Sequence, residues 1–109
     1  MNINKFMSKS PLECIEGWFL AQCDGDWEHN YGFKIETTDN PGWYVEVDLS
    51  ETELQDTVIP FVRDEISESE WIQFEVREEK FCGSGGVLNL NKILLQFLSI
   101  IRQESRHGK

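Results

Sequence analysis

A short turn flanked by two alternating segments is the feature of this sequence that most constrains its fold. In residues 31–37 and again in residues 43–49, apolar or aromatic side chains alternate with polar ones, which is the period of a strand buried on one side. The residues between them, 39–42 (Asp-Asn-Pro-Gly), are typical turn formers. The sequence therefore predicts an antiparallel hairpin, with Trp43 on its buried face in phase with Val45.

Helix signals stand near both ends of the chain. Ser10, Pro11 and Glu13 supply a cap, a proline at the first helical position and the reciprocal capping residue, so we expect an amphipathic helix over residues 11–23. Asn89 is the expected cap of a second helix. Its apolar stripe has helical spacing and consists of Leu90, Ile93, Leu94, Phe97, Leu98 and Ile101, widened by Leu95 and Ile100. We expect this stripe to face the core, and dimerisation of an adaptor protein through the same helix is the alternative.

Two further strands are predicted between the hairpin and the last helix. Residues 58–62 favour a strand, but Pro60 has no N–H for a ladder, so this strand should lie at a sheet edge or contain a break. Residues 72–76 alternate as a fourth strand, with Trp71 out of phase. The remaining segments are expected to be irregular: a polar loop at 24–30, one helical turn at 50–56 and a flexible glycine-rich loop at 82–86.

The order helix, four strands, helix predicts the fold class. We expect an α+β fold in which a four-stranded antiparallel sheet carries the N- and C-terminal helices packed on one face. A chain of 109 residues has the size of one domain. We therefore expect a single domain over residues 1–109, with an ordered core over about residues 10–104 and a frayed tail beyond it.

The charge of the chain is strongly negative and unevenly placed. The formal net charge is −10, and residues 13–79 hold nineteen acidic residues against three basic ones, a local net charge of −16. Such a field repels nucleic-acid phosphate and anionic lipid, and it accelerates the approach of a basic protein surface. We therefore expect no direct binding to nucleic acid or membrane; a purely solubilising role for the acidic residues is the alternative.

The sequence has no motif for a cysteine metal site, a phosphate-binding loop or a membrane segment. Cys14, Cys23 and Cys82 have no metal-ligand spacing, so we expect reduced thiols. The glycine run at 82–86 lacks the Lys-Ser/Thr pair of a phosphate-binding loop. The sequence shows neither a secretory leader nor an apolar run of roughly 20 residues that could span a bilayer. We expect a cytoplasmic protein without cofactor or bound metal.

Asp24, Asp26, Glu28 and His29 form the densest cluster of polar side chains. Carboxylates with imidazole suit divalent cations, but the calcium-loop template requires Gly where this chain has His29 and Glu where it has Ile35. We favour structural or partner-contact roles for this cluster. A small metal-dependent or acid-base enzyme that uses these four residues is the alternative.

At these residues the chain resembles the immunity protein 53 family, small proteins that are predicted to protect bacteria from the toxins of polymorphic toxin systems. The resemblance extends from the first helix to the last and rests on Trp18, residues 23–29 (Cys-Asp-Gly-Asp-Trp-Glu-His), Tyr31-Gly32, residues 39–43, Asp48-Leu49, Trp71, Asn89-Leu90, Ile93, Leu94 and Phe97. It implies a cytoplasmic, non-catalytic inhibitor of a cognate toxin. Many such toxins are nucleases, whose substrate grooves are positive.

The resemblance and the charge together predict a partner and a surface. The partner is expected to be a cognate toxin with a basic surface, and the chain itself is expected to be a monomer or weak homodimer. The candidate partner-binding residues are Asp24, Asp26, Trp27, Glu28, His29, Glu46 and Asp48.

Overall fold

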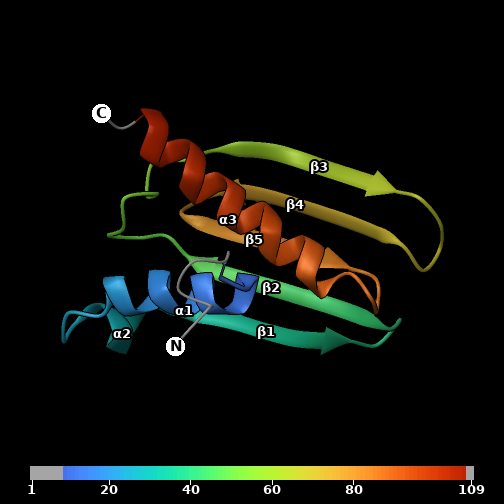
Figure 1. Ribbon diagram of the computed structural model, residues 1–109, viewed down its shortest axis with the longest axis horizontal. Helices are drawn as coiled ribbons and strands as arrows, with labels where there is room; N and C mark the ends of the chain where they lie inside the picture. Colours follow the sequence, from blue (N-terminus) through green and yellow to red (C-terminus); the bar gives the residue numbers. More distant parts are fainter. Residues whose placement is uncertain (1–8, 108–109) are drawn as a thin grey trace, which may run out of the picture.

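The computed structural model describes residues 9–107, which form an α+β fold with one antiparallel sheet (Figure 1). The elements in chain order are α1 (Pro11–Gln22), α2 (Trp27–Asn30), β1 (Phe33–Thr38), β2 (Gly42–Asp48), β3 (Ile59–Glu65), β4 (Trp71–Arg77), β5 (Lys80–Gly85) and α3 (Leu90–His107). The fold class is confirmed, but the prediction of four strands is wrong: the sheet has five, in the order β1-β2-β5-β4-β3.

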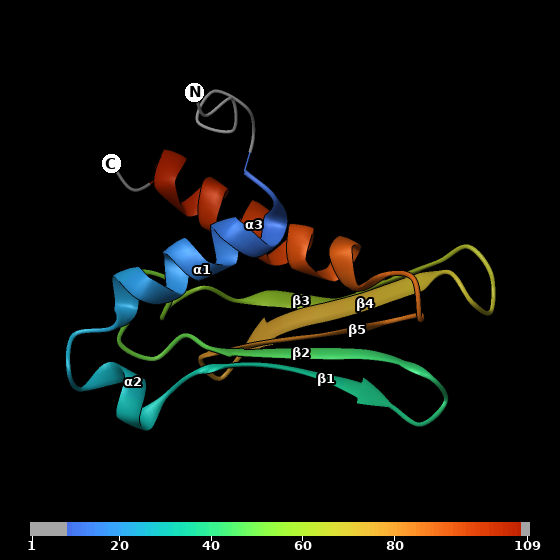
Figure 2. The same cartoon turned by 60° about the horizontal axis from the view of Figure 1, so that its bottom comes forward.

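Helices α1 and α3 lie on the same face of the sheet, and the other face is uncovered in residues 9–107 (Figure 2). Helix α3 crosses the sheet diagonally over its central strands, and α1 packs beside α3 on the side of β1 and β2. The expected packing of both helices on one face is therefore confirmed. The short helix α2 leads into β1 at one end of the sheet.

The missed strand, β5, is the centre of the sheet. It pairs with both β2 and β4, although its glycines predicted a flexible loop at 82–86. The glycines are needed because α3 lies directly on this strand: a Cβ at Gly83 would stand 2.8 Å from Cγ2 of Ile93, and one at Gly85 would stand 3.1 Å from Cδ1 of Ile93. The Cβ at Gly85 would also stand 2.9 Å from the carbonyl oxygen of Trp71 on the neighbouring strand β4. Close helix packing, and not flexibility, explains the composition of β5.

A tight turn of two glutamates joins β4 to β5. Arg77 pairs with Lys80, and Glu78 and Glu79 between them have φ angles of 52° and 64°. Positive φ at both central residues belongs to the turn type that suits the twist of a hairpin, but Asn and Gly are its usual occupants. The absence of a glycine signal at this turn is a second reason why the hairpin was missed.

The sequence signals at the start of α1 act as predicted. Ser10 Oγ accepts a hydrogen bond from the N–H of Glu13, and Glu13 Oε1 accepts one from the N–H of Ser10, at 3.1 and 2.9 Å. This capping box and Pro11 fix the first turn of the helix. The helix ends at Gln22, within one residue of the predicted boundary.

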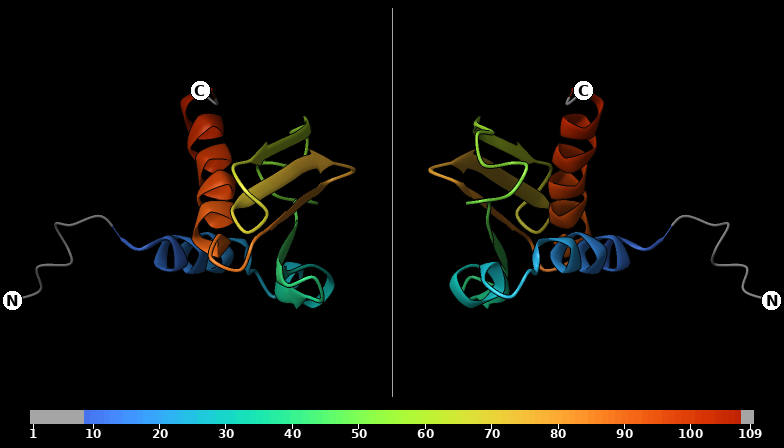
Figure 3. Two further views of the ribbon diagram at one scale, coloured as in Figure 1. Left: turned by 90° about the vertical axis from the view of Figure 1, so that its right-hand side faces the viewer. Right: turned by 90° about the vertical axis from the view of Figure 1, so that its left-hand side faces the viewer.

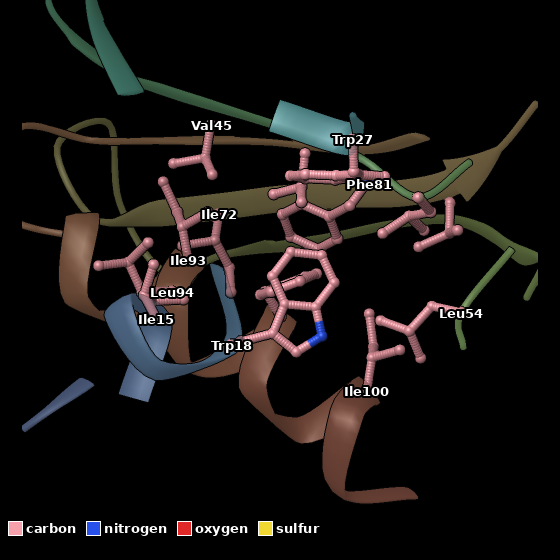
Figure 4. Packing of buried hydrophobic residues seen from close by; sticks show 14 residues of the cluster. Ile15, Trp18, Trp27, Val45, Leu54, Ile72, Phe81, Ile93, Leu94 and Ile100 are labelled. Atoms are coloured by element: carbon pink, nitrogen blue, oxygen red, sulfur yellow. The ribbon is translucent and has the colours of Figure 1, made fainter. Parts of the chain in front are cut away.

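The core lies between the two long helices and the sheet (Figure 4). Trp18 of α1 meets Trp27 edge-to-face, with ring centroids 6.1 Å apart, and it meets Phe97 of α3 in the same way at 5.1 Å. The fully or nearly buried apolar residues are Ile15, Trp18, Trp27, Val45, Val47, Leu49, Leu54, Ile72, Val76, Phe81, Ile93, Leu94, Phe97 and Ile100. Of the two residues that widen the stripe of α3, Ile100 is 5% exposed and belongs to this core, whereas Leu95 is 45% exposed.

The segments around the sheet differ from expectation in two places. The predicted polar loop at 24–30 contains the helix α2, and residues 50–56 form hydrogen-bonded turns in place of a helical turn. Asn89 is 1% exposed, and its side-chain oxygen accepts from the N–H of Trp71 at 3.0 Å, so it ties the start of α3 to β4. The predicted fraying from Glu104 stays a prediction, and residues 108–109 lie outside the described part.

The prediction for the strand with Pro60 is confirmed. Strand β3 lies at one edge of the sheet, and its register with β4 shifts between Ile59 and Val62, on either side of the proline. Strand β1 forms the other edge. It pairs with β2 as the predicted hairpin, from Phe33 opposite Val47 to Thr38 opposite Gly42.

Candidate functional site

The loop before α2 is held together by two of its own carboxylates. Asp24 Oδ1 accepts hydrogen bonds from the N–H groups of Asp26 and Trp27, at 3.0 and 2.9 Å. Glu28 folds back and accepts from the N–H groups of Asp24 and Gly25, at 2.9 to 3.1 Å. The loop therefore closes on itself through side chains that the sequence placed in a candidate site.

The N–H donors around Asp24 also affect its titration. The hydrogen bonds from Trp27 and then Asp26 stabilise the charged form and hold the pKa of Asp24 below its ordinary value. Asp24 is thus both exposed and ionised while it fixes the backbone of the loop. A negative charge is built into the start of α2.

Trp27 must be removed from the expected partner-contact surface. Its side chain is 2% exposed and lies in the core, where its Nε1 donates to the carbonyl oxygen of Ser50 at 2.8 Å. The amphipathic helix α2 buries this indole while Asp26 and His29 remain exposed. Trp27 therefore anchors the loop and is not available to a partner in this structure.

Three acidic segments meet at one end of the sheet: residues 24–30, residues 49–58 and the turn 78–79 (Figure 1; Figure 3, right). We call this surface the acidic end. Its segments contain eight acidic residues and no lysine or arginine. The acidic residues are Asp24, Asp26, Glu28, Glu51, Glu53, Asp56, Glu78 and Glu79.

Hydrogen bonds tie these three segments to one another and to the core. Ser50 Oγ donates to Glu79 Oε1 at 2.7 Å, and the N–H of Leu49 donates to the carbonyl oxygen of Glu79 at 2.8 Å. Trp18 Nε1 donates to Glu53 Oε2 at 2.8 Å. With the Trp27 bond to Ser50, every segment of the acidic end has at least one fixed attachment.

Four carboxylates of the acidic end make no side-chain hydrogen bond or ion pair with another described residue. They are the exposed side chains of Asp26, Glu51, Asp56 and Glu78. Their charges are unpaired among the side chains that the structure describes, residues 9–103, in contrast to the carboxylates of Asp24, Glu28, Glu53 and Glu79. They are therefore free to meet a partner without loss of an internal bond.

Glu46 and Asp48, the other two candidates, lie on the uncovered face of the sheet. Lys80 on the neighbouring strand β5 bridges them, with Nζ 3.3 Å from Glu46 Oε2 and 2.5 Å from Asp48 Oδ1. The Tyr44 hydroxyl donates to Glu46 Oε1 at 2.8 Å, and this bond, with Lys80, lowers the pKa of Glu46. Asp48 Oδ2 accepts from the N–H of Gly32 at 2.9 Å. Both carboxylates thus have internal partners, and a role in binding stays a prediction for them.

The uncovered face as a whole is nearly balanced in charge. The register places on it Lys34, Arg63, Arg77 and Lys80 together with Glu36, Glu46, Asp48, Glu65 and Glu75. Trp71, which is out of phase with the buried residues of β4, also lies here, under the guanidinium of Arg63 at 4.8 Å from the ring centroid. The large excess of negative charge is therefore a property of the acidic end and not of the open sheet.

A metal-dependent site receives no support from the geometry. Among the described side chains, residues 9–103, no group of three or more His, Cys, Asp and Glu is arranged to hold a metal ion. Within the cluster of Asp24, Asp26, Glu28 and His29, two carboxylates already accept main-chain N–H groups. The arrangement suits a negative protein-binding surface better than a cation site.

Residues 12–102 match the family model described as immunity protein 53. The chain belongs to the immunity protein 53 family. The resemblance found in the sequence is thereby confirmed, and it makes this immunity protein an inhibitor directed against a toxin. Membership of such a family indicates a protein that binds a cognate toxin. Searches among curated proteins and among solved structures gave no match.

Five members of the acidic end of this immunity protein were not among the residues predicted to bind a partner: Glu51, Glu53, Asp56, Glu78 and Glu79. A signal for them was present. In an antiparallel sheet, alternate connections lie at the same end, so the segment before the first strand, the one after the second and the one after the fourth should meet. A count of the acidic residues in the connections at each end of the predicted sheet would have found this surface.

Of the helices in the described range 9–107, none is long and apolar enough to cross a membrane.

Proposed function

We propose that this immunity protein neutralises its cognate toxin by occlusion, with the acidic end covering a basic surface of the toxin. The single observation that carries the proposal is the meeting of eight acidic residues, without a lysine or arginine, on three segments that hydrogen bonds fix in place. A fixed, single-sign surface accelerates association with a partner of opposite charge and disfavours partners of the same sign.

The backbone of the acidic end supports the proposal. In residues 9–107, the residues other than glycine with positive φ are Glu51, Glu78 and Glu79, at 62°, 52° and 64°. A side chain in this left-handed region costs roughly 1–2 kcal/mol, and Gly or Asn carries a smaller penalty. Glutamate at all three positions, all within one surface, is what selection for charge over local stability would produce.

A nuclease is the class of toxin that such a surface fits best. A nuclease binds a phosphate backbone in a positive groove, and a rigid row of carboxylates presents the same sign of charge to that groove. Occlusion then needs no chemistry from the immunity protein, only shape and charge that compete with the nucleic acid. The cytoplasm, where a cell's own nucleic acid needs protection, is the compartment we propose for the complex.

The test uses the carboxylates that are free of internal bonds. Reversal of Asp24 or Glu28 would open the loop before α2 and confuse folding with binding. We therefore choose the triple variant D26K/E51K/D56K and measure its association with the cognate toxin at several salt concentrations. We expect the affinity to fall at least about tenfold, mostly through a slower association rate, with a weaker dependence on salt.

A matched control reverses the same number of charges at other sites. The variant D39K/D64K/E68K also raises the net charge by six, but its three exposed residues lie outside the acidic end. It should bind the toxin nearly as the parent chain does. Equal losses in the two triple variants would show a non-specific charge effect, and unchanged binding in both would remove the acidic end from the interface.

A further inference from the structure

Strand β1 is an open edge of the sheet with an unused set of backbone groups. It is the outermost strand beside β2 (Figures 1 and 2). The N–H of Asp48 donates to the carbonyl oxygen of Gly32 at 3.0 Å, so the main-chain groups of Gly32 point toward β2. Because these groups alternate in direction along a strand, those of Phe33, Ile35 and Thr37 point outward, away from the sheet.

The two edges of the sheet differ in how they are protected. Strand β3 has Pro60, which lacks a donor, and a shift in register beside it, two devices that hinder pairing with another chain. Strand β1 pairs with β2 in regular register and has neither device. On its helix side, Ile35 is 38% exposed, and Phe33 lines an open groove of about 320 Å³ with Phe19.

The sequence of β1 is complementary to itself when two copies run antiparallel. With Ile35 placed opposite Ile35 of a second copy, Phe33 faces Thr37 and Lys34 faces Glu36, each pair occurring twice. The outward backbone groups of Ile35 then face each other, as a hydrogen-bonded pair requires. Lys34 and Glu36 are more than half exposed, and their own ion pair is long, at 3.9 Å, so both can turn to a partner.

We propose that β1 is a dimerisation edge, through which two copies of this chain form one continuous ten-stranded sheet about a two-fold axis at Ile35. The proposal is independent of the toxin and of the acidic end. Strand β3 offers no such match, since pairing about its Val62 would set Phe61 against Arg63 and Pro60 against Asp64. A single strand pair buries little surface, so the dimer is weak and depends on concentration.

The first experiment is sedimentation equilibrium of the full chain at physiological salt, over a concentration series that reaches the millimolar range. The parent chain is expected to show a reversible monomer–dimer equilibrium. Substitutions K34E and E36K each turn two opposite-charge pairs into two like-charge pairs and should each weaken the dimer on the order of tenfold. A parent chain that is monomeric at every concentration overturns the proposal.

A mixing experiment tests the register. A K34E chain and an E36K chain have complementary edges, so their mixture should form a heterodimer about as strong as the parent dimer. The matched control mixes K34E with D64K, in which the same gain of charge lies on β3 and the net charges of the mixture are the same. D64K keeps the parent edge and forms its own homodimer, so a fluorescent label on the K34E chain follows the heterodimer alone, and in this mixture the heterodimer should not regain the affinity. Equal association in the two mixtures, or none in the first, overturns the proposed pairing.

A proline tests the backbone bonds. The N–H of Thr37 points outward, so T37P removes a donor for the second copy while the bonds between β1 and β2 remain. Circular dichroism should show a folded chain and sedimentation a loss of the dimer. A folded T37P chain that dimerises like the parent overturns the proposal.

Discussion

Trp27 and Ser50 join two acidic segments through one hydrogen bond: the indole Nε1 of Trp27 donates to the carbonyl oxygen of Ser50 at 2.8 Å. The same indole is buried against Trp18 and Tyr31. One side chain thus supplies packing for the core and the attachment that sets the position of α2 relative to residues 49–58. The geometry of the acidic end depends on the core beneath it.

Replacing Trp27 by Phe should therefore destabilise the chain. The substitution leaves the Ser50 carbonyl without its buried donor and removes part of the packed ring, and a buried group left unpaired costs about 1–3 kcal/mol. Urea denaturation gives the free energy of unfolding. The control is W43F: Trp43 Nε1 also donates to a carbonyl, that of Val87, at 2.8 Å, but in an exposed position where water can replace it. Equal losses would contradict the role assigned to Trp27.

Gly83 and Gly17 should respond to alanine with opposite signs. A Cβ at Gly83 would stand 2.8 Å from Ile93 Cγ2, so G83A forces α3 away from β5, and overpacking of this kind costs about 1–3 kcal/mol. A Cβ at Gly17, within α1, has no atom within 4 Å, so G17A should stabilise the chain by up to about 1 kcal/mol through helix propensity. Thermal unfolding of both variants measures the difference. If G83A leaves the thermal stability unchanged, a Cβ at this position of β5 does not overpack against α3, and the explanation given for Gly83 is wrong.

The sequence predicted correctly those elements that are determined by residues close together in the chain. The capping box at Ser10 and Glu13, the hairpin around residues 39–42 and the edge position of the strand with Pro60 follow from residues close in the sequence, and all three were found. The class of fold followed from their order. The immunity protein family was also identified from residues of the sequence.

The missed features depend on residues far apart in the sequence. The glycines of β5 are required by Ile93 of α3 and by Trp71 of β4, and no local pattern contains that requirement. Trp27 seemed a surface residue because its neighbours are charged, but a one-turn helix separates its side chain from theirs. The acidic end joins residues as distant as Asp24 and Glu79, which only the sheet topology brings together.

The loss of folding stability at acidic pH should depend on Asp24. Hydrogen bonds from the N–H groups of Trp27 and Asp26 hold the pKa of Asp24 below its ordinary value of 3.8. A carboxylate whose pKa is lower in the folded state stabilises the fold above its unfolded pKa, and this contribution is lost as the pH falls through the folded pKa. NMR titration should place the Asp24 midpoint below 3.8, and D24A should flatten the loss of stability on acidification.

A matched variant separates charge from hydrogen bonding in that loop. D26A also removes one exposed carboxylate, but the side chain of Asp26 makes no hydrogen bond with the described residues. At neutral pH it should reduce the free energy of unfolding less than D24A does. If the two variants lose the same stability, the bonds to Asp24 do not hold the loop.

A substitution at Glu78 should raise the stability of the fold and slow binding to the toxin at the same time. Its φ of 52° suits asparagine at the first central position of this hairpin turn better than glutamate. We expect E78N to raise the free energy of unfolding by up to about 1 kcal/mol, because asparagine tolerates the left-handed region at lower cost. The same change removes one of the four unpaired charges of the acidic end, so it should also slow association with the toxin. The control is E68N, which removes an exposed charge elsewhere at a residue without positive φ and should change neither quantity. An E78N chain that gains stability and binds the toxin as fast as the parent would mean that the turn tolerates strain for a reason other than the toxin.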